Sequence, residues 1–362
     1  MPSLRANQYR NANRALISTV NKAMFKVAWD VDQYSSPRIL LHPADFGGCG
    51  HYRLINPMKE MEVKNNIQAY ATNVLMKPHE LGRFNPDSMV TQRQVLDGQV
   101  QYLHRSSSLN GVATIYDLDD LLDHVQEKNI HKKDFTQRHF DNLYKALGVV
   151  DRMICSTEFL KDWHQRYCKD IVVQHNRLRP SQWGNLTSKR GTAQKPRVGW
   201  AGGFSHAGDL EIIIDTVKSL YKVVDFVFLG YVHPEMERFI AEYHSGVSYQ
   251  TYQNKLESLN LDLALAPLED VPFNHAKSHI KVLEYGAVGV PTIASDLTPY
   301  KYFPISYPKT NDAEGFKNAI LEMISDRDAM YRMGDELQSF VKSTWMFDDE
   351  SIDKWQNAWL MK

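Results

Sequence analysis

The sequence predicts an α/β protein built from two doubly wound, Rossmann-like domains. Its 362 residues exceed one ordinary core and suit two domains of about 150 to 180 residues each. Short apolar runs alternate with helical patterns. Both halves also begin alike, with an apolar strand, a glycine-rich turn and a helix: RILLHPADFGGCG (38–50) and RVGWAGGFSHAGDL (197–210). Two such domains facing each other across a cleft would bind ligands at the carboxyl ends of their strands.

The first domain is expected over residues 38–180, after a basic N-terminal arm at 1–37. Helices are expected near HYRLINPMKEME (51–62) and EFLKDWHQRY (158–167). The expected strands are RILLHP (38–43), IQAYAT (67–72), SMVTQR (88–93), VATIYDL (112–118), VDRMICST (150–157) and DIVVQHN (170–176).

A polar segment with Pro and Gly breakers predicts the interdomain linker at 181–195. The second domain follows at 196–345, and a C-terminal helix at 346–362 is expected to pack back on the first domain. The expected strands are RVGWAGG (197–203), DFVFLG (225–230), VSYQTY (247–252), LDLALAP (261–267) and VPTIASD (290–296). The expected helices are DLEIIIDTVKSLYK (209–222), PEMERFIAEYH (234–244) and one around FNHAKSHIKVLEYGAV (273–288).

Composition points to a soluble globular protein of the cytoplasm. Hydrophobic residues make up 43% and charged residues 23%, and the net charge of −1 argues against a globally basic nucleic-acid binder. No apolar run approaches the roughly 18 residues of a membrane helix, and a signal-peptide core is missing. Cys49, Cys155 and Cys168 show no metal or redox spacing. The arm at 1–37 is basic, and a solvated surface helix is its simplest interpretation.

Two lysines near the expected start of a helix are the most informative local feature. Lys277 and Lys281 are spaced i, i+4, and Glu284 follows Lys281 at i+3, which puts all three on one helix face. Cations at a helix N-terminus cost up to roughly 1 kcal/mol. A solvated face with a Lys281–Glu284 ion pair is one explanation. A bound diphosphate would instead make both lysines favourable and leave Glu284 to accept hydrogen bonds from ribose hydroxyls.

The glycine turns and an acidic pair are further candidate sites. Neither GGCG nor GWAGG is the dinucleotide fingerprint, so an NAD-linked oxidoreductase is disfavoured. Short glycine turns let backbone N–H groups approach a phosphate or sugar, although tight packing also explains them. The Asp117-x-Asp119 pair has the form of a metal-binding pair, and capping of the following helix by Asp119 or Asp120 is the alternative.

The order of these pieces resembles the GT-B glycosyltransferases of the retaining family 4 type, from about residue 38 to the C-terminus. The segment NHAKSHIKVLEYGAVGVPTIASD (274–296) is similar to the family's donor-site signature, and DRMICSTEFLKD, VVQHNRLRPSQW and RVGWAGGFSHAGDL resemble other family segments. The resemblance implies a nucleotide-sugar donor. It assigns the donor-binding residues Gly48, Cys49, Gly50, Gly203, Ser205, His206, Lys277, Ser278, His279, Lys281 and Glu284.

Within that set, Glu284 matches the ribose-binding glutamate, and Ser278 and His279 match positions whose backbone amides meet the diphosphate. His206 stands where the family usually has a lysine, and Lys277 replaces the family's first glutamate. The lysines are therefore the expected substitute cations. Asp117, Asp119 and Lys277 are the catalytic candidates. The family commonly has His-Asp where this chain has Tyr116-Asp117.

The implied reaction is sugar transfer with retention from a UDP- or GDP-sugar, with no metal required and no dedicated nucleophile. The GGCGHYR loop and the basic arm also resemble phage-encoded glycosyltransferases that modify DNA. A hydroxymethylated base in double-stranded DNA, in the host cytoplasm, is thus the leading acceptor. The alternatives are a cell-surface glycan or lipid-linked precursor, a small molecule or protein acceptor, a nucleotide-sugar 2-epimerase of the same fold, and a non-catalytic nucleic-acid binder.

Overall fold

The computed structural model describes residues 36–64, 67–109, 112–129 and 132–362. Of the predicted basic arm at 1–37, all but the last two residues lie outside the described part. The chain divides into two compact units. The first comprises the residues up to Asp119, Thr136–His175 and Asp348–Lys362, and the second comprises Asp120–Phe135 and Asn176–Phe347. The chain therefore passes from one unit to the other four times.

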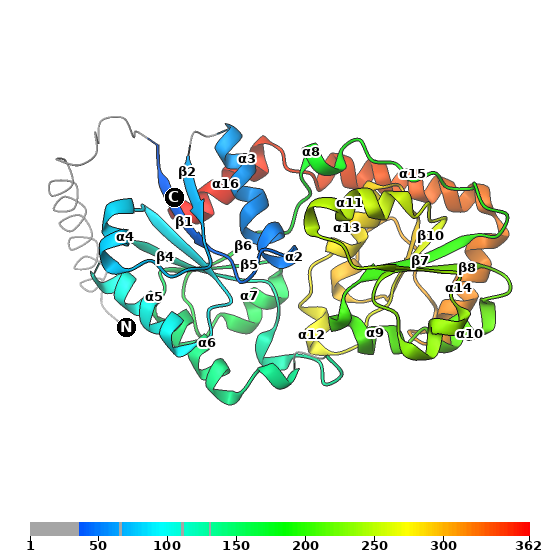
Figure 1. Ribbon diagram of the computed structural model, residues 1–362, viewed down its shortest axis with the longest axis horizontal. Helices are drawn as coiled ribbons and strands as arrows, with labels where there is room; N and C mark the ends of the chain where they lie inside the picture. Colours follow the sequence, from blue (N-terminus) through cyan, green and yellow to red (C-terminus); the bar gives the residue numbers. More distant parts are fainter. Residues whose placement is uncertain (1–35, 65–66, 110–111, 130–131) are drawn as a thin grey trace. The chain divides into compact units, whose positions relative to one another are not determined.

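The first unit is built on a parallel six-stranded sheet with the order β2-β1-β3-β4-β5-β6 (Figure 1). Its strands are β1 Arg38–His42, β2 Gln68–Ala71, β3 Ser88–Gln92, β4 Ala113–Leu118, β5 Arg152–Cys155 and β6 Ile171–Val173. The central strands are apolar on both faces, as parallel strands covered on two sides must be, and Ile39, Leu40 and Leu41 are 0% exposed.

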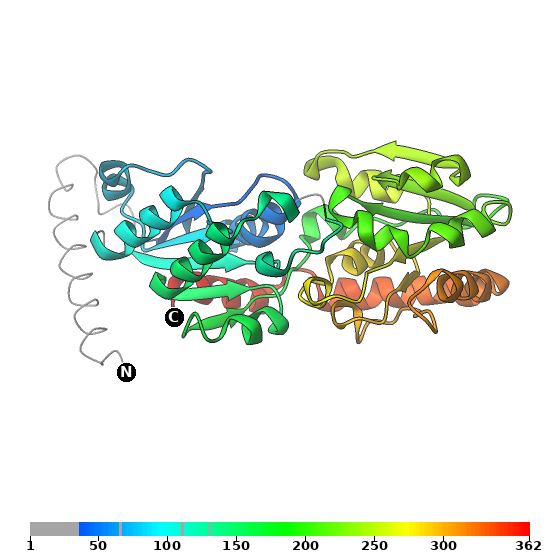
Figure 2. The ribbon, with the colours of Figure 1, turned by 90° about the horizontal axis from the view of Figure 1, so that it is seen from below.

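Helices of the first unit follow its strands in turn, except for the last, which comes from the chain's end. They are α2 Gly48–Gly50, a π-helical segment η2 His51–Ile55, α3 Asn56–Lys64, α4 Pro78–Phe84, α5 Asp97–Leu109, α6 Gln137–Val149, α7 Glu158–His164 and α16 Asp349–Leu360. Helix α16, red in Figures 1 and 2, packs against α3 and β3. Its N-terminus is capped by Asp348, whose carboxylate accepts a 2.9 Å hydrogen bond from the Ser351 amide.

The second unit has a parallel five-stranded sheet with the order β11-β10-β7-β8-β9. Its strands are β7 Arg197–Gly202, β8 Asp225–Gly230, β9 Glu242–Ser245, β10 Leu263–Ala266 and β11 Thr292–Ala294. Gly230 has φ +97°, and a side chain there would collide with the Gly202 carbonyl at 2.2 Å. Glycine is therefore required where β7 and β8 end side by side.

Helices of the second unit cover both faces of its sheet, with α13 against α15 and α10 against α14 (Figure 1). The α-helices are α8 Pro180–Trp183, α9 Ala207–Glu211, α10 Ile214–Leu220, α11 Tyr249–Ser258, α12 Pro272–His275, α13 Ile280–Ala287, α14 Ala313–Ser325 and α15 Arg327–Thr344. The 3-10 segments are η3 Leu122–His124, η4 Lys132–Asp134, η5 Phe204–His206, η6 Pro234–Phe239 and η7 Thr298–Tyr300.

Two predicted elements of the second domain are wrong. The helix expected at 234–244 is the 3-10 segment η6 followed by the edge strand β9, and the strand expected at 247–252 is the start of helix α11. Strand β9 pairs with β8, and Glu242 forms a bidentate ion pair with Arg197 at 2.6 and 2.9 Å. These tertiary contacts override the helix expected at 234–244. The next α-helix, α11, begins only downstream, and its residues Gln253 and Leu256 are buried at the helical spacing i, i+3.

Two of the segments that pass between the units run side by side. The amide of Leu178 donates to the Trp345 carbonyl at 3.0 Å, and the amide of Phe347 donates to the Leu178 carbonyl at 2.9 Å. The Arg177 guanidinium also donates to the Thr344 carbonyl at 2.8 Å. The segments next to the third and fourth passages of the chain are therefore joined within the second unit.

Candidate functional site

The turn after β7 lies at the switch point of the second sheet. Strand β7 neighbours both β8 and β10, and the connections leave in opposite directions there, which is where open α/β sheets bind ligands. A side chain at Gly202 would meet the Trp200 ring at 2.6 Å, so glycine is needed for packing. A side chain at Gly203 would have nothing within 4 Å. The turn is thus closed on its inner side and open at Gly203.

Lys281 lies directly beneath this turn. Its side chain is 7% exposed, Nζ donates to the Ala201 carbonyl at 2.5 Å, and the ammonium lies 4.8 Å from the centre of the Trp200 ring. Burial, with the nearby charge of Lys277, lowers the pKa of Lys281 to about 8, although Glu284 opposes the shift. A lysine with a weakened proton affinity at a glycine turn is a favourable partner for an anion.

Lys277 lies outside the helix that the sequence predicted for it. Helix α13 begins at Ile280 with His279 at its N-cap, so Lys277 belongs to the preceding loop. The expectation that Lys277, Lys281 and Glu284 share one helix face is therefore wrong for Lys277. Its ammonium lies 4.7 Å from the centre of the Phe273 ring. The charge of Lys277 lowers the pKa of both Lys281 and His206.

Asp209 is the centre of a buried hydrogen-bond network in this part of the unit. It is 0% exposed. Its carboxylate accepts from the Glu269 amide at 3.0 Å and from Asn274 Nδ2 at 2.7 Å, and Gln126 Nε2 lies 3.4 Å away. Burial disfavours its charge, but the hydrogen bond and charge of His206 outweigh it and lower the pKa of Asp209. The carboxylate therefore organises the turn after β7 and the loop after β10.

His206, at the end of the turn after β7, contacts the Asp209 carboxylate through its imidazole ring. Nδ1 of His206 lies 2.8 Å from Oδ2 of Asp209, and the imidazole is 18% exposed. Burial is the largest cause that lowers the pKa of His206 to about 4, and the charge of Lys277 adds to it. The ring is neutral at pH 7 as a result. Ser205, a partly buried neighbour, lies in the same 3-10 segment, η5.

Ser278 and His279 shape the loop that leads into α13. Asn176, the first residue of the second unit after the third passage, donates from Nδ2 to Ser278 Oγ at 2.8 Å. The His279 ring packs against Trp345 with ring centres 4.1 Å apart, and it is 7% exposed. The His279 side chain is thus part of the core.

Glu284 lies one turn into helix α13. It is 7% exposed, and one carboxylate oxygen accepts a 2.9 Å hydrogen bond from the Tyr252 hydroxyl. Tyr252 comes from helix α11, which the sequence predicted as a strand. The tyrosine therefore orients the carboxylate.

The glycine loop of the first unit is ordered by Asp45. Its carboxylate accepts from the Gly47 amide at 2.7 Å and from the Gly50 amide at 3.3 Å. A side chain at Gly50 would overlap the Asp45 carbonyl at 1.8 Å, whereas one at Gly48 would have nothing within 4 Å. Packing therefore explains Gly50, and the open side of Gly48 leaves room for a ligand.

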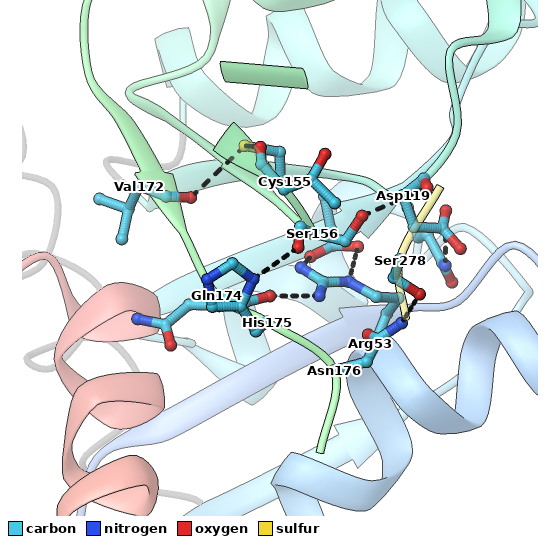
Figure 3. Close-up of polar contacts among 12 residues, drawn as sticks. Arg53, Asp119, Cys155, Ser156, Val172, Gln174, His175, Asn176 and Ser278 are labelled. Carbon is cyan, nitrogen blue, oxygen red and sulfur yellow. Dashed lines mark hydrogen bonds and ion pairs between the residues drawn. The ribbon is translucent and has the colours of Figure 1, made fainter. Parts of the chain in front are cut away.

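Asp117 is bound by Arg53 inside the first unit. Both are 0% exposed, Arg53 Nε donates to Oδ1 at 3.0 Å, and Nη2 donates to Oδ2 at 2.8 Å. Arg53 also donates to the Gln174 carbonyl at 2.5 Å (Figure 3). Its guanidinium lies 4.9 Å from the centre of the Trp355 ring. Burial raises the pKa of Asp117 to about 6 against the opposing charge of Arg53. Asp117 is a buried ion-pair partner.

Asp119 is held by a second arginine. Arg93 Nε donates to Oδ1 of Asp119 at 2.6 Å, and Arg93 Nη2 lies 3.4 Å from Cys49 Sγ. Burial disfavours the charge of Asp119, but Arg93 and then Arg53 lower its pKa. Ser156 Oγ donates to the Asp119 carbonyl at 3.3 Å, and the Ser156 carbonyl lies 3.0 Å from His175 Nδ1 (Figure 3). The ends of β4, β5 and β6 are thus joined.

No cluster of three or more His, Cys, Asp or Glu with metal-binding geometry occurs among the described residues. Within the same residues, every helix is too short or too polar to cross a bilayer.

Sequence reasoning missed several residues that hold the candidate side chains in place within each unit. They are Arg53, Arg93, Asn176, Asp209, Tyr252 and Asn274. Asp209 follows His206 at i+3, a spacing that could have identified the pair. The partners of Arg53, Asn176 and Tyr252 are 64, 102 and 32 residues away, so no local pattern could have identified them.

Comparison with known proteins identifies the fold. No protein-family model matches the sequence, and no curated protein matches it significantly. Sucrose-phosphate synthase from Thermosynechococcus elongatus superimposes with a TM-score of 0.64 at 11% identity, over 89% of this chain and 98% of the other. HepE from Anabaena, solved with UDP and glucose, gives 0.58 at 13% identity over 88% and 98%.

A third solved structure, an alpha-glucosyltransferase in complex with UDP-glucose and DNA containing an abasic site, gives a TM-score of 0.61 at 12% identity, over 91% and 100% of the two chains. All three structures are GT-B glycosyltransferases, and each is matched over nearly its whole length. The chain has the GT-B fold. The predicted fold class is thereby confirmed. At these identities the comparison establishes architecture alone.

Proposed function

We propose that the protein is a retaining glycosyltransferase that takes its sugar from a UDP-sugar. The observation that carries the proposal is the group of basic side chains around the open turn at Gly203. Lys281 lies beneath the turn, and His206 lies at its end. The charge of Lys277 lowers the pKa of both. The likeness to HepE and to the alpha-glucosyltransferase, both solved with a uridine nucleotide, supports UDP over GDP.

Charge balance supports a diphosphate ligand. Burial and the charge of Lys277 reduce the proton affinity of both Lys281 and His206. A diphosphate at the switch point would offset both costs and accept hydrogen bonds from backbone N–H groups of the turn and of the loop at Ser278. Glu284, oriented by Tyr252, lies one turn further along α13 and is the ribose-binding carboxylate in this proposal.

In the proposed reaction an acceptor oxygen bonds to the anomeric carbon as the bond from that carbon to the donor phosphate breaks. Negative charge develops on the leaving diphosphate, where Lys277 and Lys281 stabilise it. The acceptor proton passes to a phosphate oxygen, so no protein nucleophile is needed. Asp119, held by Arg93, is the acceptor-side carboxylate in this proposal, and Asp117 acts through Arg53 as a positioning residue.

The leading acceptor in the proposal is a hydroxymethylated base in DNA. The alpha-glucosyltransferase structure with bound DNA supports this choice, because it shows that a chain of this fold and length accommodates DNA. A DNA acceptor would place the reaction in the cytoplasm, and in a host cell for a phage-encoded enzyme. No metal is required, since the cations of the site are side chains.

The donor proposal is tested by thermal unfolding with UDP, GDP, ADP, TDP and their sugar conjugates, with and without EDTA. A ligand present at about 100 times its dissociation constant adds about 2.7 kcal/mol to the free energy of unfolding. We expect UDP and one UDP-sugar to raise the unfolding temperature in both conditions. A response to none of the nucleotides would refute the donor site.

The acceptor proposal is tested by transfer of radiolabelled sugar to three substrates: duplex DNA with hydroxymethylated cytosine, the same duplex unmodified, and lipid extracts. We expect label only in the modified duplex. Label in the lipid fraction would replace DNA with a lipid-linked acceptor. Conversion of the sugar itself, without any acceptor, would identify an epimerase instead.

A further inference from the structure

His206 is bound to a carboxylate whose other hydrogen bonds fix it in place. Nδ1 of His206 lies 2.8 Å from Oδ2 of Asp209, while Oδ1 accepts from the Glu269 amide and from Asn274 Nδ2 at 3.0 and 2.7 Å. Tyr300, a buried neighbour of Asp209 on η7, stays neutral because burial raises its pKa. An ionised carboxylate only accepts hydrogen bonds, so the proton of the neutral imidazole lies on Nδ1. Nε2 then holds a lone pair.

Charges around the imidazole come from four directions. Lys277 acts from the loop before α13, Lys281 from within α13, and Asp209 from α9. Glu269, on the loop after β10, lies just beyond Asp209, whose carboxylate its amide contacts. The two ammonium groups oppose a charge on His206, and burial is larger still, so that the pKa of His206 falls to about 4. Burial and the two lysines keep the imidazole neutral, whereas the Asp209 carboxylate would stabilise its cation.

An anion at the Gly203 turn reverses this balance. A diphosphate would neutralise the field of Lys277 and Lys281 and would itself attract a proton to Nε2. The cation so formed would donate through both nitrogens, from Nδ1 to Asp209 and from Nε2 to a phosphate oxygen. A permanently charged lysine or arginine at this position would interact with the anion without any change of protonation.

We propose that the donor diphosphate binds together with one proton, which His206 takes up at Nε2 and holds between the diphosphate and Asp209. This inference rests on the proposed function, and it adds that the donor site gains its third cation only when it is filled. The proton comes from solvent and returns to it when the nucleotide leaves. No bond other than N–H forms or breaks, so the step needs no further reactant.

The test is isothermal titration calorimetry with UDP-glucose at about pH 6.5, in buffers of different ionisation enthalpy. UDP-glucose is the right probe because its diphosphate, esterified at both ends, lacks the terminal phosphate group that titrates near pH 6. At this pH Lys281 is already almost wholly protonated, given its pKa of about 8. The slope of the observed enthalpy against the buffer ionisation enthalpy counts the protons taken up by the protein.

We expect the wild-type protein to take up about one proton per UDP-glucose, and the association constant to fall by up to about tenfold per pH unit once His206 in the complex begins to lose its proton. His206→Gln should bind more weakly and take up none. His206→Lys should bind with no uptake and with little dependence on pH between about 5.5 and 7.5. His104→Gln, at an exposed position on α5 of the first unit, is the matched control and should behave as wild type.

Three outcomes would overturn the inference: wild-type binding without proton uptake, equal uptake in wild type and His206→Gln, or uptake retained in His206→Lys. Each of these leaves the donor site itself intact, because UDP-glucose still binds. Absence of binding by UDP-glucose and by the other nucleotides would refute the donor site and this inference together. The two failures are therefore distinguishable.

Discussion

The two units treat buried charge in opposite ways. In the first unit, Arg53 pairs with Asp117 through two hydrogen bonds, and Arg93 pairs with Asp119. In the second unit, Lys281 is 7% exposed and donates to a backbone carbonyl. Its pKa is lowered to about 8, and that of nearby His206 to about 4. One unit matches its buried charges, and the other gathers bases that repel one another.

The difference separates structural ion pairs from a ligand site. A buried charge with an ideal partner is satisfied by the fold and requires nothing more. Bases whose proton affinity is reduced by burial and by each other become favourable only when an anion arrives. By this criterion Asp117 belongs to the framework of the first unit, whereas Lys277, Lys281 and His206 belong to the site.

The largest expected effect is on stability, and it comes from breaking the matched pair. Arg53→Met leaves the Asp117 carboxylate buried without its arginine and should lower the free energy of unfolding by about 3–5 kcal/mol. Urea unfolding followed by circular dichroism at pH 7 measures the loss. Arg197→Met is the comparison variant: its partner Glu242 is 41% exposed, so the carboxylate left behind stays hydrated and the loss of stability should be clearly smaller than for Arg53→Met.

A double variant sharpens this result. Arg53→Met combined with Asp117→Leu removes both charges and should recover most of the lost stability. A double variant as unstable as the single one would show that Arg53 acts mainly through Gln174 and Trp355 rather than through the ion pair. UDP binding by the folded double variant should equal that of wild type, since neither position is among the proposed donor-binding residues.

The next effect is on ligand affinity. Glu284→Ala removes the proposed ribose acceptor and should weaken UDP binding by about 1–3 kcal/mol, the cost of unmaking charged hydrogen bonds. Calorimetry gives the affinity directly. Tyr252→Phe, which removes only the 2.9 Å hydrogen bond to that carboxylate, should cost about 1 kcal/mol. Unchanged UDP affinity in a folded Glu284→Ala protein would remove the ribose assignment.

The fold class was predictable because it depends on local patterns repeated many times. Parallel strands buried on both faces are short apolar runs, and RILLH and RVGWAG show this clearly. The errors lie at the edge of the second sheet. EYHS becomes strand β9 by pairing with β8, although its own pattern is helical, and YQTYQNKLES becomes helix α11. Pairing at an edge is a tertiary property that the segment itself does not encode.

The candidate site was predictable only in part, for a related reason. The glycine turn, His206, Lys281 and Glu284 were found because each lies in a recognisable short motif. The environment that gives them their chemistry comes from distant residues. Asp209 needs Asn274, which is 65 residues away, and the Ser278 loop needs Asn176. The expectation that Lys277 lies on the helix failed because α13 starts three residues later, after the His279 ring enters the core.

A smaller effect concerns the loss of stability caused by the buried cation of Lys281. Lys281→Met should stabilise the ligand-free protein at pH 7 by about 1 kcal/mol, because a buried cation is replaced by an apolar chain while the bond to the Ala201 carbonyl is lost. The same variant should bind UDP-glucose more weakly. Urea unfolding and calorimetry on one sample measure both changes, and a variant less stable than wild type at pH 7 would contradict the comparison.

The pH dependence of wild-type stability is a second test of whether the buried Lys281 cation destabilises the ligand-free protein. The pKa of Lys281 is about 8 in the folded chain against 10.5 for an ordinary lysine. The unfolded state therefore binds more protons between these values, and this residue makes stability rise as pH increases from about 8 to about 10.5. Below pH 8 its penalty is fully present. Lys281→Met should lack this rise when unfolding curves are measured across that range.

The smallest expected effect tests how the donor loop is held in place. Asn176 contacts Ser278 through one 2.8 Å hydrogen bond and lies where the chain enters the second unit. Asn176→Ala should weaken UDP-glucose binding by about 1 kcal/mol, roughly fivefold, because the loop before α13 loses its anchor. Ser278→Ala, which removes the other partner of the same bond, should give a similar loss, and the double variant should lose little more than either single one. Additive losses would mean that the two side chains act separately, and that Asn176 does not position the loop.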